Sequence, residues 1–132
     1  MVPTPYEQLG GEAVVLRLAE RFYDIMERDE PALTAVHKRD AAGRILQVSR
    51  DRFALFLIGW LGGPQTYQER HGHPRLRMRH GQVQIGQDLR DAWMRSMVKA
   101  LDELAIGGDI RGFVETRLGE VATFLKNVDE SG

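Results

Sequence analysis

The amino-acid sequence predicts an all-α fold, and three observations lead to that prediction. Apolar residues recur at steps of three and four along four long segments, which is the period of an amphipathic helix. Glycine pairs and prolines interrupt the chain between those segments. Residues 82–85 alternate as a strand would, but no second strand is available to pair with them. With 132 residues the chain has the length of a single domain, and we expect one domain over residues 1–132 with an ordered core at about 4–127.

The first expected helix is very short. Thr4 can cap its start, Pro5 suits the first turn, and Glu7 completes a capping box with Thr4. Gly10 and Gly11 follow within one further turn, and we expect the helix to end there.

A longer amphipathic helix is expected over residues 12–28. Its apolar face consists of Val15, Leu18, Ala19, Phe22, Ile25 and Met26. Asp29 and Glu30 precede Pro31, which favours the start of another short helix that ends at about Val36. Residues 37–40 are polar and form a connection.

The next long helix is expected to begin at Asp40 or Gly43 and to end at Trp60, because Gly-Gly-Pro at residues 62–64 stops it. Its apolar face consists of Ile45, Val48, Phe53, Phe56, Leu57 and Trp60. The following residues, as far as Ile85, show no strong period and predict an irregular loop. A loop of that length in so compact a domain usually has a functional reason.

Two more helices complete the expected set, at residues 87–104 and 109–125. Gly107 and Gly108 separate them, and Asp109 can cap the second. The apolar residues of the first are Leu89, Ala92, Trp93, Met97, Ala100, Leu101 and Leu104. Those of the second are Ile110, Phe113, Val114, Leu118, Val121, Ala122 and Leu125.

Composition limits the classes of function. Eighteen Lys and Arg nearly balance nineteen Asp and Glu, so the overall charge gives no argument for nucleic acid or an anionic membrane as a partner. The chain has no cysteine, which excludes disulfides, iron–sulfur clusters and Cys-based zinc sites. The first residues lack a signal-peptide pattern, and the longest uncharged apolar stretch, residues 53–63, is too short to cross a bilayer. We therefore expect a cytoplasmic protein with no membrane partner.

Residues 70–80 contain four arginines and three histidines, and several interpretations are open. His71 and His73 suit a divalent metal ion, but no His or Cys elsewhere offers a second pair to complete the site. Alternating arginines would line one face of an extended strand and bind phosphate or nucleic acid; these are Arg75, Arg77 and Arg79. A solvated basic loop is the third interpretation.

A haem site is the fourth interpretation of this segment. Haem iron takes an axial ligand, often a neutral imidazole, and leaves its other face open for a gas. Its propionates pair well with arginine, and its faces need apolar walls. One histidine beside several arginines, between helices rich in Phe, Leu and Met, meets all three needs, although spacing alone does not establish it.

Four motifs occur in an order and at spacings that match one known family. They are Arg-Phe-Tyr at 21–23, Trp-Leu-Gly-Gly-Pro-Gln-Thr-Tyr at 60–67, His-Gly-His-Pro-Arg-Leu-Arg-Met-Arg-His at 71–80 and Arg-Asp-Ala-Trp-Met at 90–94. With them the chain resembles the truncated haemoglobins, in particular their second group, from Tyr6 to about Asn127. The resemblance implies a two-over-two helical sandwich around haem b (iron protoporphyrin IX). The implied helix pairs are 12–28 with 40–60, and 87–104 with 109–125.

The resemblance also implies roles for individual residues. It places the proximal iron ligand at His80 and the distal hydrogen-bond donors at Tyr23 and Trp93, although both aromatic residues are also consistent with plain core packing. His37 falls where many relatives have Tyr or Phe near the distal pocket. Counting back from the Gly-Gly-Pro motif places Phe53 over the haem and Ser49 at the gate one turn earlier. The remaining pocket or propionate residues are Arg52, Tyr67, Arg79, Phe56 and Met97.

The expected function is reversible binding of dioxygen and other small ligands such as nitric oxide and carbon monoxide. Several polar donors around the ligand favour slow release, which suits nitric oxide dioxygenation or peroxidase-type chemistry with an unidentified reductase. A module of another class, helical and free of haem, would bind phosphate or nucleic acid through residues 70–79. We expect a monomer or a weak homodimer.

Overall fold

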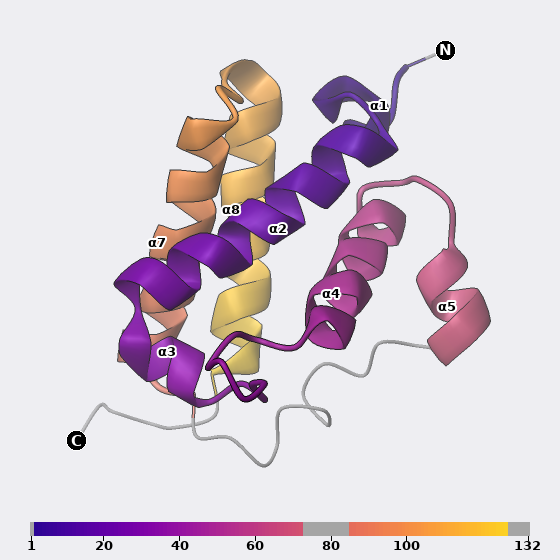
Figure 1. The fold of residues 1–132 in the computed structure, drawn as a ribbon. Coiled ribbons are helices and arrows are strands. Elements are labelled where there is room, and N and C mark those ends of the chain that lie inside the picture. Colours follow the sequence, from indigo (N-terminus) through magenta and orange to yellow (C-terminus); the bar gives the residue numbers. More distant parts are fainter. Residues whose placement is uncertain (1, 73–84, 127–132) are drawn as a thin grey trace.

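The computed structural model describes residues 2–72 and 85–126, and every regular element in these ranges is a helix. The helices are α1 (Pro5–Leu9), α2 (Glu12–Asp29), α3 (Pro31–Ala35), α4 (Gln47–Trp60), α5 (Thr66–His71), α7 (Gln87–Glu103) and α8 (Gly108–Leu125), as Figure 1 shows. The one β feature of the described ranges is an isolated bridge between Arg39 and Ile45. The predicted all-α class is therefore confirmed.

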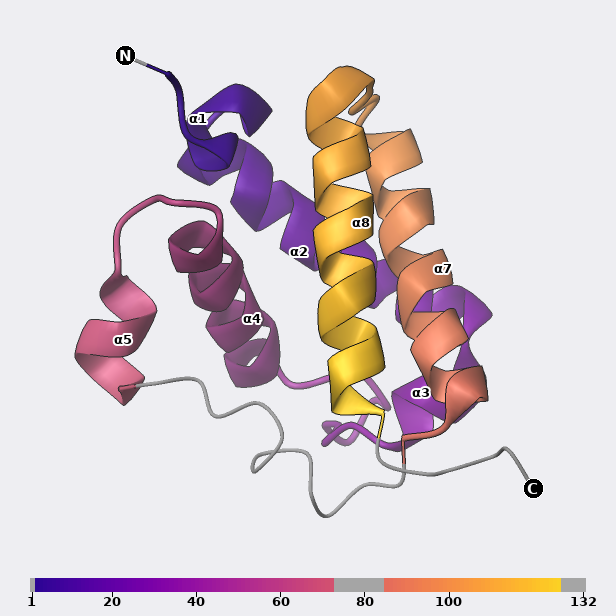
Figure 2. The ribbon, with the colours of Figure 1, turned by 180° about the vertical axis from the view of Figure 1, so that it is seen from behind.

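Two pairs of helices enclose the core. α2 packs against α4, α7 packs against α8, and α2 also crosses α7, so that it belongs to both halves of the molecule. Figure 2 shows the opposite side, where α7 and α8 lie side by side with α2 behind them. All six apolar residues predicted for the second helix are buried: Val15, Leu18, Ala19, Phe22, Ile25 and Met26.

The capping box predicted for the first helix is confirmed. The backbone N–H of Glu7 donates to Thr4 Oγ1 at 3.2 Å, and the backbone N–H of Thr4 donates to Glu7 Oε1 at 3.4 Å. Gly10 ends the helix in the left-handed region with φ of 117°. A Cβ added there would lie 2.8 Å from the Val14 side chain, so glycine is required both by the backbone and by the space.

The start predicted for the long central helix is wrong, because α4 begins at Gln47 and not at Asp40 or Gly43. Asp40 closes a turn instead: its Oδ1 accepts from the backbone N–H groups of Ala42 and Arg44, at 2.9 and 3.0 Å. An Asp side chain that satisfies nearby amides in this way competes with helix formation. Val48, predicted for the apolar face, is 53% exposed.

Two smaller differences concern a short helix within the stretch predicted to be an irregular loop, and the start of the last helix. The stretch that lacks an apolar period contains α5, in which Tyr67 is the single buried residue. The last helix begins at Gly108 with Gly107 as its cap, one residue before the predicted Asp109. Among the described residues, no helix combines the length and apolar character needed to cross a membrane.

Candidate functional site

An aromatic cluster lies where α2, α4 and α7 meet. Phe22 of α2 is its centre, with no exposed surface, and its ring centroid lies 5.1 Å from those of Tyr23, Phe53 and Trp93. The rings of Tyr23 and Trp93 meet Phe22 edge-on, which is a favoured arrangement for aromatic pairs.

Four predicted site residues come together around this centre, and we call them the distal cluster: Tyr23, His37, Phe53 and Trp93. The Tyr23 ring lies perpendicular to Phe53 at 5.7 Å and to His37 at 5.9 Å. The Trp93 ring approaches Phe53 edge-on at 6.0 Å. They come from three long helices and from the residues that follow α3, so the fold itself assembles the cluster.

Two polar atoms of the distal cluster have no hydrogen-bond partner among the described residues, namely the Tyr23 hydroxyl and the Trp93 indole N–H. No fully buried side-chain nitrogen or oxygen lacks a partner in that part of the chain, so both atoms reach accessible space. Burial raises the pKa of Tyr23 well above its ordinary value, whereas Arg50 lowers it and Glu20 raises it. The phenol is therefore protonated at neutral pH and available as a donor.

His37 has a defined orientation in the distal cluster. Its Nδ1 lies 2.9 Å from the carbonyl oxygen of Leu33, one turn earlier. Because a carbonyl oxygen can only accept, Nδ1 carries the proton, and Nε2 is the acceptor of the neutral ring.

A second set of aromatic residues continues from the distal cluster along α4 to α5. Phe53 stacks on Phe56 with centroids 6.3 Å apart, and Phe56 meets Tyr67 edge-on at 6.2 Å. Tyr67 in turn contacts the His71 ring at 5.1 Å. Phe53, Phe56 and Trp93 pack on the core but are only half-buried, so they form an apolar surface that a flat ligand would cover.

Comparison with known proteins agrees with this arrangement. The family model described as "Bacterial-like globin" matches residues 4–124. A group 2 truncated haemoglobin of Bacillus subtilis, YjbI, is 35% identical over 127 residues, which cover 96% of this chain and 91% of that protein.

The chain belongs to the group II truncated haemoglobins.

Solved structures support the same family. A cold-adapted truncated haemoglobin from the Antarctic marine bacterium Pseudoalteromonas haloplanktis has a TM-score of 0.88 and 43% identity, over 96% of this chain and all of that one. The group II truncated haemoglobin of Bacillus anthracis has a TM-score of 0.91 and 34% identity, over 100% of this chain and 98% of that one. The two-over-two globin fold is thereby confirmed, with α2 and α4 as one pair and α7 and α8 as the other.

Membership of the globin family implies a haem cofactor and small gaseous ligands. The residues of this truncated haemoglobin fit such a group. Haem needs apolar walls, and Phe53, Phe56 and Trp93 present half-buried rings on one side of the core. A ligand on the iron needs donors, and Tyr23 and Trp93 carry two that have no partner among the described residues.

The other predicted site residues lie in different surroundings. Met97 is fully buried in the core, Ser49 lies half-buried in the first turn of α4, and Arg52 is exposed. Arg79 and His80 lie outside the described residues.

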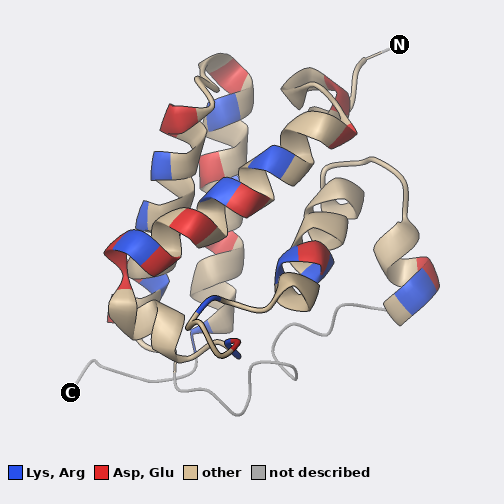
Figure 3. Ribbon diagram, in the orientation of Figure 1, with Lys and Arg blue, Asp and Glu red and all other residues tan. Residues whose placement is uncertain are grey.

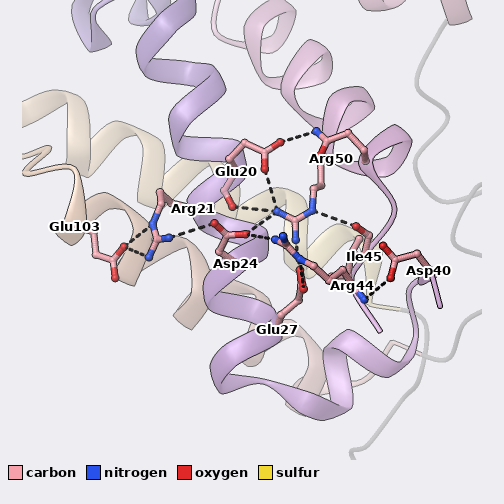
Figure 4. A network of polar contacts seen from close by, with 10 residues as sticks. Glu20, Arg21, Asp24, Glu27, Asp40, Arg44, Ile45, Arg50 and Glu103 are labelled. Carbon is pink, nitrogen blue, oxygen red and sulfur yellow. Dashed lines mark hydrogen bonds and ion pairs between the residues drawn. The ribbon is translucent and has the colours of Figure 1, made fainter. Parts of the chain in front are cut away.

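One residue near the site was not predicted from the sequence. Arg50 of α4 is only 2% exposed, and its guanidinium faces three carboxylates on α2: Glu20, Asp24 and Glu27 (Figure 4). The spacing of those acids, at i, i+4 and i+7, places them on one face of a helix, which is the single signal that the sequence contains.

Proposed function

We propose that this truncated haemoglobin binds haem b at the distal cluster, with His80 as the iron ligand, and that it binds dioxygen, nitric oxide and carbon monoxide reversibly. When bound, the haem supplies an iron with one open face for such a ligand. The observation that carries the proposal is that two donors, Tyr23 Oη and Trp93 Nε1, have no partner among the described residues, while their rings both pack on Phe22 and Phe53.

The residues of the chain have separate tasks in this proposal. The protonated Tyr23 hydroxyl and the Trp93 indole donate hydrogen bonds to a ligand that enters the pocket. Phe53 and Phe56 exclude water and pack against the flat cofactor. The cofactor's propionates are assigned to Arg52, Tyr67 and Arg79, the gate to Ser49, and the inner wall to Met97.

A redox activity of the nitric oxide dioxygenase or peroxidase type is the second candidate, and His37 favours it. Peroxidase chemistry needs an acid–base group near the distal ligand. His37 lies 5.9 Å from Tyr23, ring to ring, and its Nδ1 donates to the carbonyl oxygen of Leu33, so a titratable side chain lies beside the proposed donor. Repeated turnover would require an electron-donating reductase as a partner.

Absorption spectra of the ferric, ferrous and CO-bound forms test the main proposal. We expect a strong Soret band in the purified protein, and its loss or a changed ferrous spectrum in His80→Ala. The matched control is His71→Ala, which removes a nearby histidine and is expected to keep the spectrum. A colourless protein that binds nucleic acid less tightly as salt increases would instead support the haem-free helical module.

A further inference from the structure

We propose that Arg50 is a positioning residue for the distal pocket: it holds the first turn of α4, and with it Ser49 and Phe53, in a fixed relation to Tyr23 on α2. This inference rests on the proposed function, because it assumes that Tyr23 and Phe53 face the ligand.

The hydrogen bonds of Arg50 connect three parts of the fold. Its Nη1 donates to Asp24 Oδ1 at 2.8 Å and to Glu20 Oε2 at 3.0 Å, and its Nη2 donates to Glu27. Its Nε donates to the carbonyl oxygen of Ile45 at 3.2 Å, two residues before α4 begins. One buried side chain thus joins α2, the end of the turn at residues 40–45, and α4.

Arg50 also lies next to the proposed ligand donor. Its Cζ is 5.6 Å from the centroid of the Tyr23 ring, within the range of a cation–π contact. Phe53, three residues further along α4, is perpendicular to the same ring at 5.7 Å. Since an α-helix moves as a rigid unit over one turn, a shift at Arg50 displaces Phe53 relative to Tyr23.

Charge explains why this side chain cannot be removed without moving the helices. A buried guanidinium is tolerated only when its donors are satisfied, and here carboxylates supply the acceptors. Without Arg50, the carboxylates of Glu20, Asp24 and Glu27 would face the start of α4. Their remaining partners would be Arg44, Arg21 and Gln47, whose amide donates to Glu20 at 2.7 Å. We expect α4 to move away from α2 in response.

Arg44 provides a matched control because it binds the same carboxylates from a different place. It reaches Asp24 at 2.9 Å and Glu27 at 3.4 Å, but it is 59% exposed and lies on the turn before α4 (Figure 4). Replacing Arg44 removes one positive charge from beside these carboxylates and leaves the hydrogen bonds between Arg50 of α4 and the carboxylates of α2 in place.

The test is a double-mutant cycle on dioxygen release, measured by stopped flow. We expect Arg50→Met to accelerate release about fivefold or more and Arg44→Met to change it by less than about twofold. Arg50→Lys keeps the positive charge but loses the planar guanidinium with its several donors. Its rate of dioxygen release is expected to lie between those of the wild type and Arg50→Met. In a Tyr23→Phe background the effect of Arg50→Met should fall below about twofold, since the donor that it positions is absent.

Hydrogen–deuterium exchange at the amides of residues 47–53 supplies a readout that does not depend on ligand binding. These amides are expected to exchange faster in Arg50→Met than in Arg44→Met. If Arg50→Met does not fold, Glu27→Gln takes its place, with the same direction expected for both measurements. Equal effects of the two arginine variants, or an undiminished effect in the Tyr23→Phe background, would overturn the inference. A wild-type protein without a Soret band would instead contradict the proposed function. The exchange experiment would still test whether Arg50 holds the first turn of α4 against α2.

Discussion

The Nδ1 atom of His37 lies 2.9 Å from the carbonyl oxygen of Leu33, so the proton on Nδ1 is donated to the backbone. In the neutral ring Nε2 is an acceptor, whereas protonation turns it into a second donor. In the proposed pocket, protonation of His37 would therefore add a third donor to those of Tyr23 and Trp93.

We predict that dioxygen release from the wild type slows as the pH falls from about 8 to about 5. The reason is that the imidazolium adds a donor beside Tyr23. His37→Phe keeps a ring at that position and should release dioxygen at a rate that is flat over the same range. A wild-type rate that does not vary with pH would mean that His37 does not face the ligand.

Trp93→Phe is expected to accelerate dioxygen release by about fivefold to tenfold, because the indole donor is lost while the edge-on contacts with Phe22 and Phe53 are kept. The control is Trp60→Phe, since Trp60 packs on Phe113 and not on the distal cluster. Stopped-flow measurement of dioxygen release from both variants distinguishes the two causes. A lost hydrogen-bond donor accelerates release in Trp93→Phe alone, whereas looser core packing affects both variants. An unchanged rate in Trp93→Phe would contradict the donor role.

Gly63→Ala is expected to destabilise the fold by about 1–3 kcal/mol. A Cβ at this position would lie 2.7 Å from the Tyr6 ring and 2.9 Å from the carbonyl oxygen of Ile58, at the corner where α1 closes over the end of α4. Gly112→Ala is the control: it lies exposed within α8, a Cβ there meets nothing, and it should stabilise the protein by about 0.5–1 kcal/mol. Urea unfolding of the two variants measures both effects.

Acid stability should depend on Glu30, which binds Arg95 of α7 through both carboxylate oxygens at 2.9 Å. The hydrogen bonds to Arg95 hold the pKa of Glu30 below its ordinary value. The unfolded chain consequently binds a proton at Glu30 at a higher pH than the folded chain does, so this pair stabilises the fold above the ordinary carboxyl pKa and loses its contribution as the pH falls. Glu30→Gln should lower Tm at pH 7, and the difference should shrink below about pH 4.5. Glu69→Gln, at an exposed position on α5, should show no such trend.

The charge pattern of α2 illustrates what a sequence can and cannot predict. The apolar face of this helix was predicted correctly, because its period follows directly from helix geometry. Acidic and basic residues alternate along its other face, as Figure 3 shows, and such a pattern is typical of a solvated surface. That Arg50 is buried against this face depends on the packing of α4, which lies 23 to 30 residues away along the chain.

The residues of the distal cluster were selected from sequence motifs, and the fold brings them together, while their roles toward a ligand stay predictions. Tyr23, His37, Phe53 and Trp93 are separated by up to 70 residues in the sequence, yet their rings are in contact. The start of α1 was also predicted correctly from local sequence, because the capping box of Thr4 and Glu7 needs no tertiary partner. The same kind of signal failed at Asp40, because a side chain that can cap a helix can equally close a turn. The later start of α4 is accompanied by tertiary hydrogen bonds from Arg50 to the carboxylates of α2, which the local sequence around Asp40 does not reveal.

The turn at Asp40 has a consequence for how this protein can vary. Its two ends are joined by the bridge between Arg39 and Ile45, and its tip, residues 41–43, is exposed. Because the ends are joined, extra residues at the tip extend into solvent and transmit no strain to α4. We therefore expect that the link between His37 and α4 can change in length without disturbing the proposed pocket, and that residues 41–43 accept an inserted tag or fluorescent label.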